Sequence, residues 1–480
     1  MPIHNDFPSS SCGPACAATV GIEPSTATYF DGLKLSRRHK FMFFLIVLGT
    51  FFDQMDLYNM SFVGPALLKN WGMTMGELAS INSIMIFTML FGGLFGGYAS
   101  DRFGRKTALL TGCLIFSIFS ICNGLAWNYY SFLIFRTITG FGIAMLISTE
   151  IGYVTEITPS NQRGKWFSIV LGVGLLGAPI TAWVSKIIIP MFDYGWRIIF
   201  FLGGAGFIVF ILGCIFLIES PRWLVAHGKY DKAKKNFKLL TGKDLIINPE
   251  DMDSSKVAKG ASYIEALSVM FNRNYIKQTT VVTNVFFFGC AGAFMFISWA
   301  PTLLTKNGMS LELSLQIGSV IAMGMPLGGI LSSFLTDKGG RKLPLGGAFM
   351  LYGICGILYG QMTNSTMIMV LGFVMAASHI AGFSMISSYG AESYPTRVRG
   401  TAYSLVYMMS RIGPAIGNLV VPLLFASVGY TSYFMIVGGI LLAVGLQCCM
   451  FGLATAGRNL EEMHEELGNG MAFRVREVLD

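Results

Sequence analysis

Asp101-Arg-Phe-Gly-Arg-Lys106 is a short charged stretch in an apolar part of the chain, and it returns as Asp337-Lys-Gly-Gly-Arg-Lys342, 236 residues later. Two other groups of residues repeat at the same offset: Gly92 and Gly93 return as Gly328 and Gly329, and Glu156, Pro159, Arg163 and Gly164 return as Glu392, Pro395, Arg399 and Gly400. Separate motifs that keep one offset indicate a duplicated chain. In a chain this apolar, two copies of one hydrophobic unit are typical of a membrane carrier.

The composition supports a membrane protein. Of the 480 residues 53% are hydrophobic and 12% are charged, whereas a soluble protein carries about 25% charged residues. Twelve apolar runs approach or exceed the roughly 20 residues that cross a bilayer as a helix. They lie near residues 41–68, 78–99, 107–126, 130–154, 166–189, 197–218, 279–304, 312–335, 343–362, 366–390, 401–426 and 431–454. We therefore predict an all-α membrane protein, with twelve transmembrane helices in two pseudo-symmetric six-helix bundles.

The positions of Lys and Arg predict the orientation in the membrane. Of the 34, we count 28 on the side that holds both termini, which places both termini in the cytoplasm. The net charge of +8 then reflects topology and not nucleic-acid binding. The first 40 residues contain no apolar stretch of signal-peptide type. The predicted order is a cytoplasmic tail 1–40, a first bundle 41–218, a cytoplasmic linker 219–277 with short amphipathic helices, a second bundle 278–454 and a cytoplasmic tail 455–480.

Nothing in the sequence predicts catalysis, a metal site or a cofactor. The chain has no GxxxxGK[ST] phosphate loop, which argues against ATP as the energy source. Cys12 and Cys16 form one isolated CxxxC pair, which is poor evidence for a metal site and is better explained as two free thiols. No set of nucleophile and base is assembled. We expect a protein without enzymatic activity that resides in the lipid bilayer.

Several motifs resemble the major facilitator superfamily. Residues 96–106, GGYASDRFGRK, resemble its signature between helices 2 and 3. Residues 153–164 resemble the end of helix 4 in its sugar-porter and organic-ion branches, and residues 219–224, ESPRWL, resemble the box that follows helix 6 there. Residues 136–142 resemble the RxxxGxG motif of helix 4. The resemblance covers about 41–454 and implies a monomeric secondary transporter that works by alternating access.

Departures from the sugar porters narrow the branch. The predicted helix 7 offers only Asn284 where hexose carriers have paired Gln and Asn, and the predicted helix 5 lacks the Gln of sugar porters. The phosphate-symporter motif of helix 4 is also not matched. Asp53-Gln-Met-Asp56 resembles the D-x-x-D pattern in helix 1 of organic-acid and metabolite symporters.

Few ionisable side chains lie within the predicted spans, away from their ends. They are Asp53, Asp56, Arg136 and Arg411, with Glu150 nearer the cytoplasmic end of helix 4. Each costs about 2.5–3.5 kcal/mol at mid-bilayer on insertion scales, so we expect a function for each. A rise of ~1.5 Å per residue places Asp53 and Arg411 about 16–18 Å in from the cytoplasm, and Arg136 level with Asp56. Acids of one half and an Arg of the other therefore converge on the centre.

These side chains suggest proton coupling and anion binding. Asp53 and Asp56 share a helix face at i and i+3, and we expect them to exchange a proton, with Arg136 tuning them. A permanent Asp56–Arg136 ion pair that joins two helices is the alternative. The Arg411 guanidinium suits a substrate carboxylate, with pairing to backbone carbonyls as the alternative. Four further polar residues are candidates for substrate binding, although residues of this kind within helices more often pack against other helices than bind a ligand: Asn59, Asn284, His379 and Asn418.

The duplicated charges predict a cytoplasmic gate. Salt bridges across this face would latch the halves together when the carrier opens outward and would break when it opens inward. Orienting the loops is the alternative role, but topology ignores acids and here the acids are duplicated with the bases. The predicted gate residues are Asp101, Arg105, Glu150, Glu156, Arg163, Asp337, Arg341, Glu392 and Arg399.

We therefore predict a secondary transporter that takes up a small organic anion with a proton. The cargo classes that fit are aromatic, sugar-derived and dicarboxylic acids. One alternative is a facilitator, or a proton antiporter, of a neutral metabolite or sugar. A second alternative is a non-transporting nutrient sensor on a carrier fold, which would be expected to carry a signalling tail longer than residues 455–480.

Overall fold

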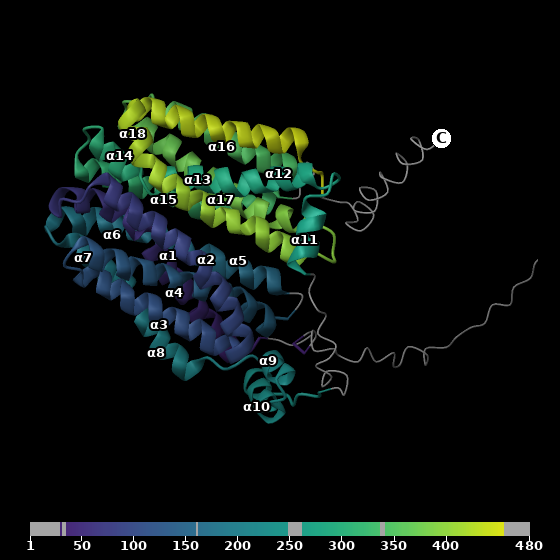
Figure 1. Cartoon of the computed structure of the whole chain (residues 1–480). Helices are drawn as coiled ribbons and strands as arrows, with labels where there is room; N and C mark the ends of the chain where they lie inside the picture. Colours follow the sequence, from purple (N-terminus) through teal and green to yellow (C-terminus); the bar gives the residue numbers. More distant parts are fainter. Residues whose placement is uncertain (1–28, 31–34, 160–161, 248–261, 337–340, 456–480) are drawn as a thin grey trace, which may run out of the picture.

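The computed structural model describes residues 29–30, 35–159, 162–247, 262–336 and 341–455, and their main elements are helices (Figure 1). The first bundle comprises α1 (Arg37–Asn70), α2 (Met75–Phe103), α3 (Arg105–Leu125), α4 (Tyr129–Ile157), the pair α5 (Arg163–Gly174) and α6 (Gly177–Met191), and the pair α7 (Gly195–Gly203) and α8 (Gly206–Phe216). Three short helices follow: α9 (Pro221–Ala226), α10 (Tyr230–Thr241) and α11 (Tyr263–Met270). The second bundle comprises α12 (Ile276–Asn284), the π-helical segment η5 (Val285–Gly289), α13 (Cys290–Ile297), α14 (Ala300–Lys306), α15 (Leu311–Leu335), α16 (Lys342–Tyr359), α17 (Ser365–Glu392) and α18 (Arg399–Phe451).

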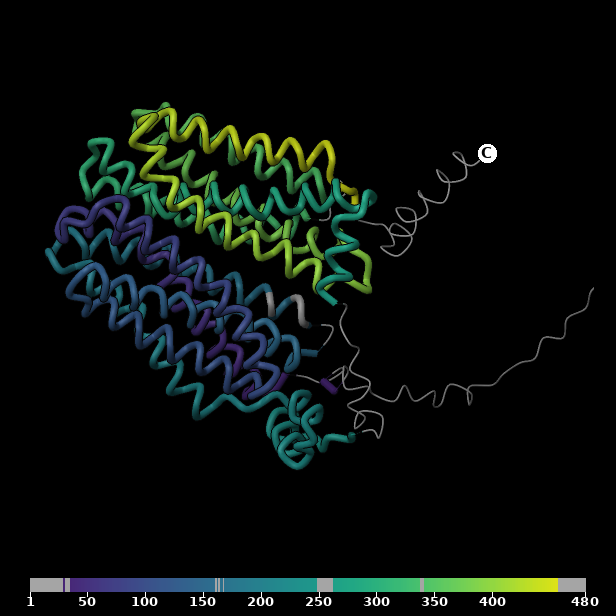
Figure 2. The backbone as a smooth tube through the Cα atoms, in the orientation of Figure 1, coloured from purple at the N-terminus to yellow at the C-terminus, as the bar shows by residue number. Residues whose placement is uncertain are grey.

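The described chain makes twelve membrane crossings. Eleven helical stretches are long and apolar enough to span a bilayer, and the last of them, α18, has 53 residues. A straight helix of that length would be roughly 80 Å long, more than twice the ~30 Å hydrocarbon layer. The chain instead reverses at Gly429, whose φ of 75° favours glycine, and Figure 2 shows the two antiparallel legs of α18. The predicted fold class, twelve helices in two bundles, is confirmed.

Three predicted spans are not uniform helices, and one of them, the span predicted at 197–218, breaks between α7 and α8. The span predicted at 166–189 breaks between α5 and α6, and the span predicted at 279–304 passes through η5 and breaks again before α14. A π segment inserts one extra residue into a helical turn and is frequent at functional sites. The span predicted at 41–68 starts earlier than predicted, at Arg37, because the Ser36 side chain caps α1 by accepting a hydrogen bond from His39 N.

Repeated glycines bring the same pairs of helices together in both bundles. A Cβ on Gly92 of α2 would meet the backbone of Phe141 on α4. A Cβ on Gly328 of α15 would meet the backbone of Ala377 on α17, and both residues of this second contact follow those of the first by 236 positions. The duplication in sequence is therefore a duplication of helix packing.

The two bundles meet at the end of the molecule opposite to α9, α10 and α11. We call this end the loop end, and the end that holds the three short helices the linker end. Across the loop end, Ser83 Oγ of α2 donates to the carbonyl of Ala415 on α18 at 2.5 Å. A cavity of about 10 Å³, near the size of one water molecule, lies between the bundles beside Phe62 and Ala300. The helices converge at the loop end and diverge toward the linker end (Figure 1).

The glycine contacts generate a stability prediction. Gly92→Val forces α2 and α4 apart, and overpacking of this kind costs about 1–3 kcal/mol, so we expect a lower melting temperature in detergent. Gly93→Val is the matched control, because a Cβ there has no neighbour within 4 Å apart from the atoms of its own helix. Equal melting temperatures for the two variants would contradict the assigned packing.

Candidate functional site

Asp56 is held within the first bundle by a complete set of partners. Its Oδ2 lies 2.7 Å from Arg136 Nη1 of α4, and both side chains are fully buried. Its Oδ1 accepts from Ser120 Oγ of α3 at 2.5 Å and from Asn59 Nδ2 at 3.3 Å. Arg136 also donates to the Asp56 carbonyl at 3.1 Å and lies over the Phe200 ring at 5.3 Å. Asp56 and Arg136 thus form an ion pair that ties α1 to α4.

Asp53, one turn before Asp56 on α1, lacks such partners. It is fully buried, and its Oδ1 accepts one hydrogen bond, from Gln54 Nε2 at 2.7 Å. Its Oδ2 has no hydrogen-bond partner among the described residues. An ionised carboxylate in that position would be strongly penalised, whereas a protonated one is tolerated. Asp53 and Asp56, which were expected to act together, therefore lie in different environments.

Arg411 of α18 faces Asp53 from the second bundle. It interacts electrostatically with the Asp53 carboxyl and with the hydroxyl of Tyr58, both on α1. Its side chain is half-buried and makes no hydrogen bond or ion pair with the described residues. A guanidinium with its five donors unused is a strong binding group for a carboxylate.

Aromatic rings continue from Arg411 toward the linker end. Tyr407 and Tyr403 precede it by one and two turns on α18, both half-buried, with ring centroids 5.7 Å apart. Phe286 of η5 lies 5.7 Å from the Tyr407 ring, and Phe383 of α17 lies 6.4 Å from it. We call these four residues the aromatic ladder. The sequence reasoning missed it, although the i, i+4, i+8 spacing of Tyr403, Tyr407 and Arg411 was a visible signal.

The other predicted substrate residues are mostly engaged in packing. Asn59 donates to Asp56, and Asn284 donates to Gln447 Oε1 at 3.0 Å. Asn418 accepts from Trp299 Nε1 at 2.7 Å and donates to the Pro414 carbonyl at 2.8 Å, so both ends of its amide are used.

His379 is the exception among these candidates. It is buried in α17, with its ring 6.2 Å from that of Tyr352 and 6.2 Å from that of Phe383 of the aromatic ladder. Its Nδ1 has no partner among the described residues. His379 therefore borders the ladder without lying in the same group as Asp53 and Arg411.

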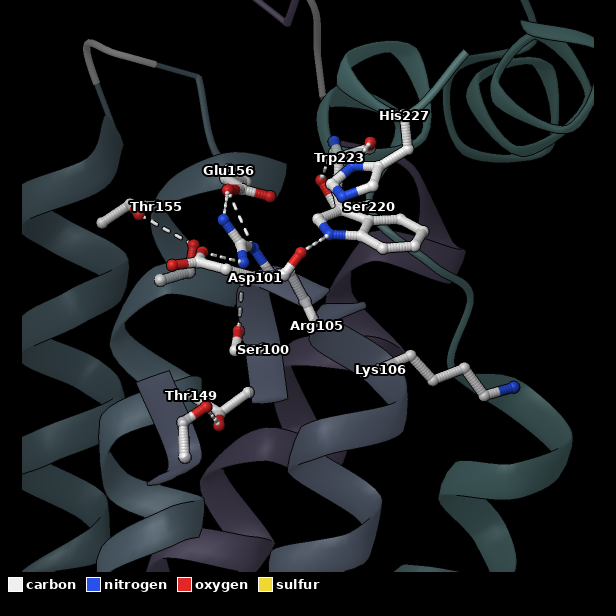
Figure 3. A network of polar contacts seen from close by, with 12 residues as sticks. Ser100, Asp101, Arg105, Lys106, Thr149, Thr155, Glu156, Ser220, Trp223 and His227 are labelled. Carbon is white, nitrogen blue, oxygen red and sulfur yellow. Dashed lines mark hydrogen bonds and ion pairs between the residues drawn. The ribbon is translucent and has the colours of Figure 1, made fainter. Parts of the chain in front are cut away.

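The first charged motif forms a network at the linker end (Figure 3). Arg105 donates to Glu156 Oε1 at 2.8 and 3.0 Å and to Asp101 Oδ1 at 2.5 Å. Trp223 Nε1 of α9 donates to the Asp101 carbonyl at 2.7 Å. The carboxylate of Glu219 accepts from Lys106 N at 3.0 Å and so caps the start of α3. Burial raises the pKa of Glu219, and hydrogen bonds from backbone N–H groups together with the charge of Arg105 oppose that rise.

The second motif forms the equivalent pair in the second bundle. Arg341 pairs with Glu392, which repeats Arg105–Glu156 at an offset of 236 residues. Arg399 donates to the Tyr394 carbonyl at 3.3 Å and to Thr396 Oγ1 at 3.1 Å. Asp337 and the side chain of Arg163 lie outside the described part of the structure. These pairs join elements of one bundle, and a latch between bundles remains a prediction for another conformational state.

Glu150 lies away from the linker-end network in which it was placed. It is buried on α4, and its Oε1 accepts a hydrogen bond from Thr50 Oγ1 of α1, one turn before Asp53. Its charge acts on Asp53. Asp53 and Glu150 therefore share an environment, buried and without an ion pair among the described residues, and sequence spacing does not reveal this relation. The described residues contain no group of three His, Cys, Asp or Glu side chains able to hold a metal ion.

The family model and the similar proteins agree in identifying a family of transporters. The sequence model described as "Sugar (and other) transporter" matches residues 40–467. YyaJ of Bacillus subtilis, named for metabolite transport, is 34% identical over 91% of this chain and 97% of its own. The 4-hydroxybenzoate transporter PcaK of Acinetobacter baylyi is 28% identical, over 78% of this chain and 81% of its own. The niacin transporter NiaP of the same organism is 27% identical, over 90% and 98%.

Solved structures agree on the fold. The inward-open xylose transporter XylE from E. coli superposes with a TM-score of 0.70 at 18% identity, covering 89% of this chain and 99% of that one.

The environments of the two aspartates predict different effects on stability. Asp56→Ala leaves the buried Arg136 guanidinium without its partner, so we expect a loss of about 3–5 kcal/mol and a clearly lower melting temperature. Asp53→Asn removes no ion pair and should melt close to wild type. A combined Asp56→Asn, Arg136→Gln variant should recover part of the loss. If Asp53→Asn and Asp56→Ala are equally destabilised, the assignment is wrong.

Proposed function

This chain belongs to the sugar (and other) transporter family of the major facilitator superfamily, and on that basis we propose that it takes up a small aromatic carboxylate together with a proton. The protein is a multi-pass membrane transporter. The proposal adds the cargo, the coupling ion and the residues that handle each. In it the linker end faces the cytoplasm and the loop end faces outward, as the distribution of Lys and Arg predicts.

The observation that carries the proposal is the free guanidinium of Arg411 opposite Asp53. A cation held between two bundles without a hydrogen-bond partner is costly unless something completes it during function. A substrate carboxylate accepts two parallel N–H bonds from such a group. Because Arg411 belongs to the second bundle and Asp53 to the first, an anion bound there would contact both halves of the carrier.

The proton belongs to Asp53 in this scheme, and Asp56 stays ionised beside Arg136. The partnerless Oδ2 of Asp53 supports a protonated carboxyl in the present conformation, which is closed at the loop end. One proton with one carboxylate moves no net charge, so the pH gradient drives accumulation, and each further proton would add ~2.3 kcal/mol per 100 mV of membrane potential.

The aromatic class rests on two supports. The ladder adjoins Arg411, and its half-buried rings of Phe383, Tyr403 and Tyr407, backed by the buried ring of Phe286, can contact a flat cargo. Two relatives are named as transporters of 4-hydroxybenzoate and of niacin, each an aromatic ring that bears a carboxylate. The ladder also gives a reason to prefer aromatic acids over the sugar-derived and dicarboxylic acids that the sequence left open.

Transport by the purified protein tests the coupling. In proteoliposomes with an inward-directed proton gradient, wild type should accumulate radiolabelled 4-hydroxybenzoate, and a protonophore should abolish accumulation. Asp53→Asn cannot release a proton and should lose accumulation while retaining exchange of internal for external substrate. Undiminished accumulation by Asp53→Asn would show that the proton site lies elsewhere.

Binding tests the role of Arg411. We expect 4-hydroxybenzoate to raise the melting temperature of the purified protein and 4-hydroxybenzamide, which lacks the charge, to have little effect. Arg411→Lys keeps the charge but loses the fork geometry, so we expect about tenfold weaker binding, equivalent to about 1.4 kcal/mol. Arg411→Gln should bind more weakly still. Equal binding of acid and amide by wild type would exclude the proposed carboxylate contact.

A further inference from the structure

We propose that Glu150 is a second proton carrier, which receives the proton from Asp53 and passes it toward the linker end. This inference rests on the proposed proton coupling and assigns a role to a buried acid that the scheme above leaves unused. Glu150 first releases its own proton toward the linker end. The transfer then moves one proton from an Asp53 carboxyl oxygen to the Glu150 carboxylate oxygen, with no change in oxidation state.

Among the described acids in this part of the first bundle, Asp53 and Glu150 are buried without an ion pair, and only Asp53 has a cation, Arg411, acting on it. Asp56 is paired with Arg136, and Glu156 is paired with Arg105. The hydrogen bond described for Glu150 comes from the uncharged Thr50. An acid buried this deeply and opposite no base is far more stable protonated than ionised, as required of a group that accepts a proton.

Thr50 suits both protonation states of Glu150. Its hydroxyl lies within hydrogen-bond distance of Glu150 Oε1 and, at 3.1 Å, of the Ile46 carbonyl. When Glu150 is ionised, the single hydroxyl proton points to the carboxylate. When Glu150 is protonated, its own proton points to Thr50 Oγ1 and Thr50 donates to Ile46. Thr50 can therefore satisfy the acid before and after proton transfer.

The positions along the helices give the path a direction. Thr50 precedes Asp53 by three residues on α1, which is ~4.5 Å nearer the linker end. Glu150 lies seven residues before the linker-end terminus of α4 at Ile157, or ~10 Å from it. Asp53 lies sixteen residues from the corresponding terminus of α1 at Arg37, or ~24 Å. Glu150 is thus intermediate between Asp53 and the linker end.

The ionisable groups around this pair are few. Asp53 on α1 feels the charges of Glu150, Asp56 and Arg411, and Cys113 of α3 feels the charge of Asp53. The other helices packed against α4 carry their charged side chains near their ends. The described charged residues on these helices are Glu77, Asp101 and Arg102 of α2, Arg105 and Lys106 of α3, and Lys165 of α5, and α4 itself also carries Arg136, Tyr153 and Glu156.

Infrared spectroscopy tests the protonation without a substrate. At neutral pH the wild-type protein should show carbonyl bands of buried protonated carboxyl groups, one of which disappears in Glu150→Gln and another in Asp53→Asn. A Glu150→Gln spectrum that retains every wild-type carboxyl band would overturn the inference. Ser148→Ala, whose hydroxyl bonds within α4, is the matched control and should leave the bands unchanged.

Transport tests the coupling. For 4-hydroxybenzoate in proteoliposomes, we expect Glu150→Gln to slow net proton-driven uptake about tenfold, to lose its dependence on the pH inside, and to leave exchange at equal pH within about twofold of wild type. Thr50→Val should give an intermediate rate, and Glu150→Asp should restore part of the uptake. Unchanged net uptake, or an equal loss of uptake and exchange in folded protein, would overturn the role of Glu150. Accumulation by Asp53→Asn would instead overturn the proposed proton symport, so the two failures are distinguishable.

Discussion

A charge between helices in a bilayer needs a partner or a proton, and this constraint organises the centre of the molecule. Arg136 and Asp56 satisfy each other at 2.7 Å within the first bundle. Arg411 has no such partner among the described residues, and Asp53 has only the amide of Gln54. The fixed pair gives the first bundle a rigid reference, and the unsatisfied groups beside it are those that a cargo anion and a proton can complete.

The duplication provides the frame, and the departures from it provide the chemistry. Gly92 against Phe141 has its counterpart in Gly328 against Ala377, and Arg105–Glu156 has its counterpart in Arg341–Glu392. In contrast, Asp53 and Asp56 correspond by the same offset to Gly289 and Gly292 in the second bundle. In the proposed scheme, this asymmetry of the central charges within a symmetric scaffold assigns the proton to the first bundle and the binding of the anion to the second.

Sequence reasoning reached the architecture because helix length, duplication and charge bias are local properties. It also identified Asp53, Asp56, Arg136 and Arg411 as the central charges, since ionisable groups in apolar runs are conspicuous. It could not separate the environments of the two aspartates, because these depend on which side of α1 meets Arg136 of α4.

Other features depend on contacts between distant segments. Glu150 was grouped with the gate because of its position near the end of a run, but the rotation of α4 against α1 directs it to Thr50. The sequence did not predict the π segment η5, because a run of apolar residues does not reveal how many residues form each helical turn. It packs where Gly413 of α18 allows the backbone of Phe287 to approach closely, two residues from Arg411.

The seal at the loop end has a consequence for the energetics of opening. It consists of Tyr58 and Phe62 of the first bundle, which lie opposite Ile297, Ala300 and Pro301 of the second. The hydrogen bond between Ser83 and Ala415 lies in the same region. The ion pairs described above lie elsewhere in the molecule. Separating such a surface exposes apolar area to water, and that cost varies little with ionic strength. External salt should therefore have little influence on the energy needed to open the loop end. Whether the loop end or the linker end opens then depends on what the charged groups beneath this seal bind.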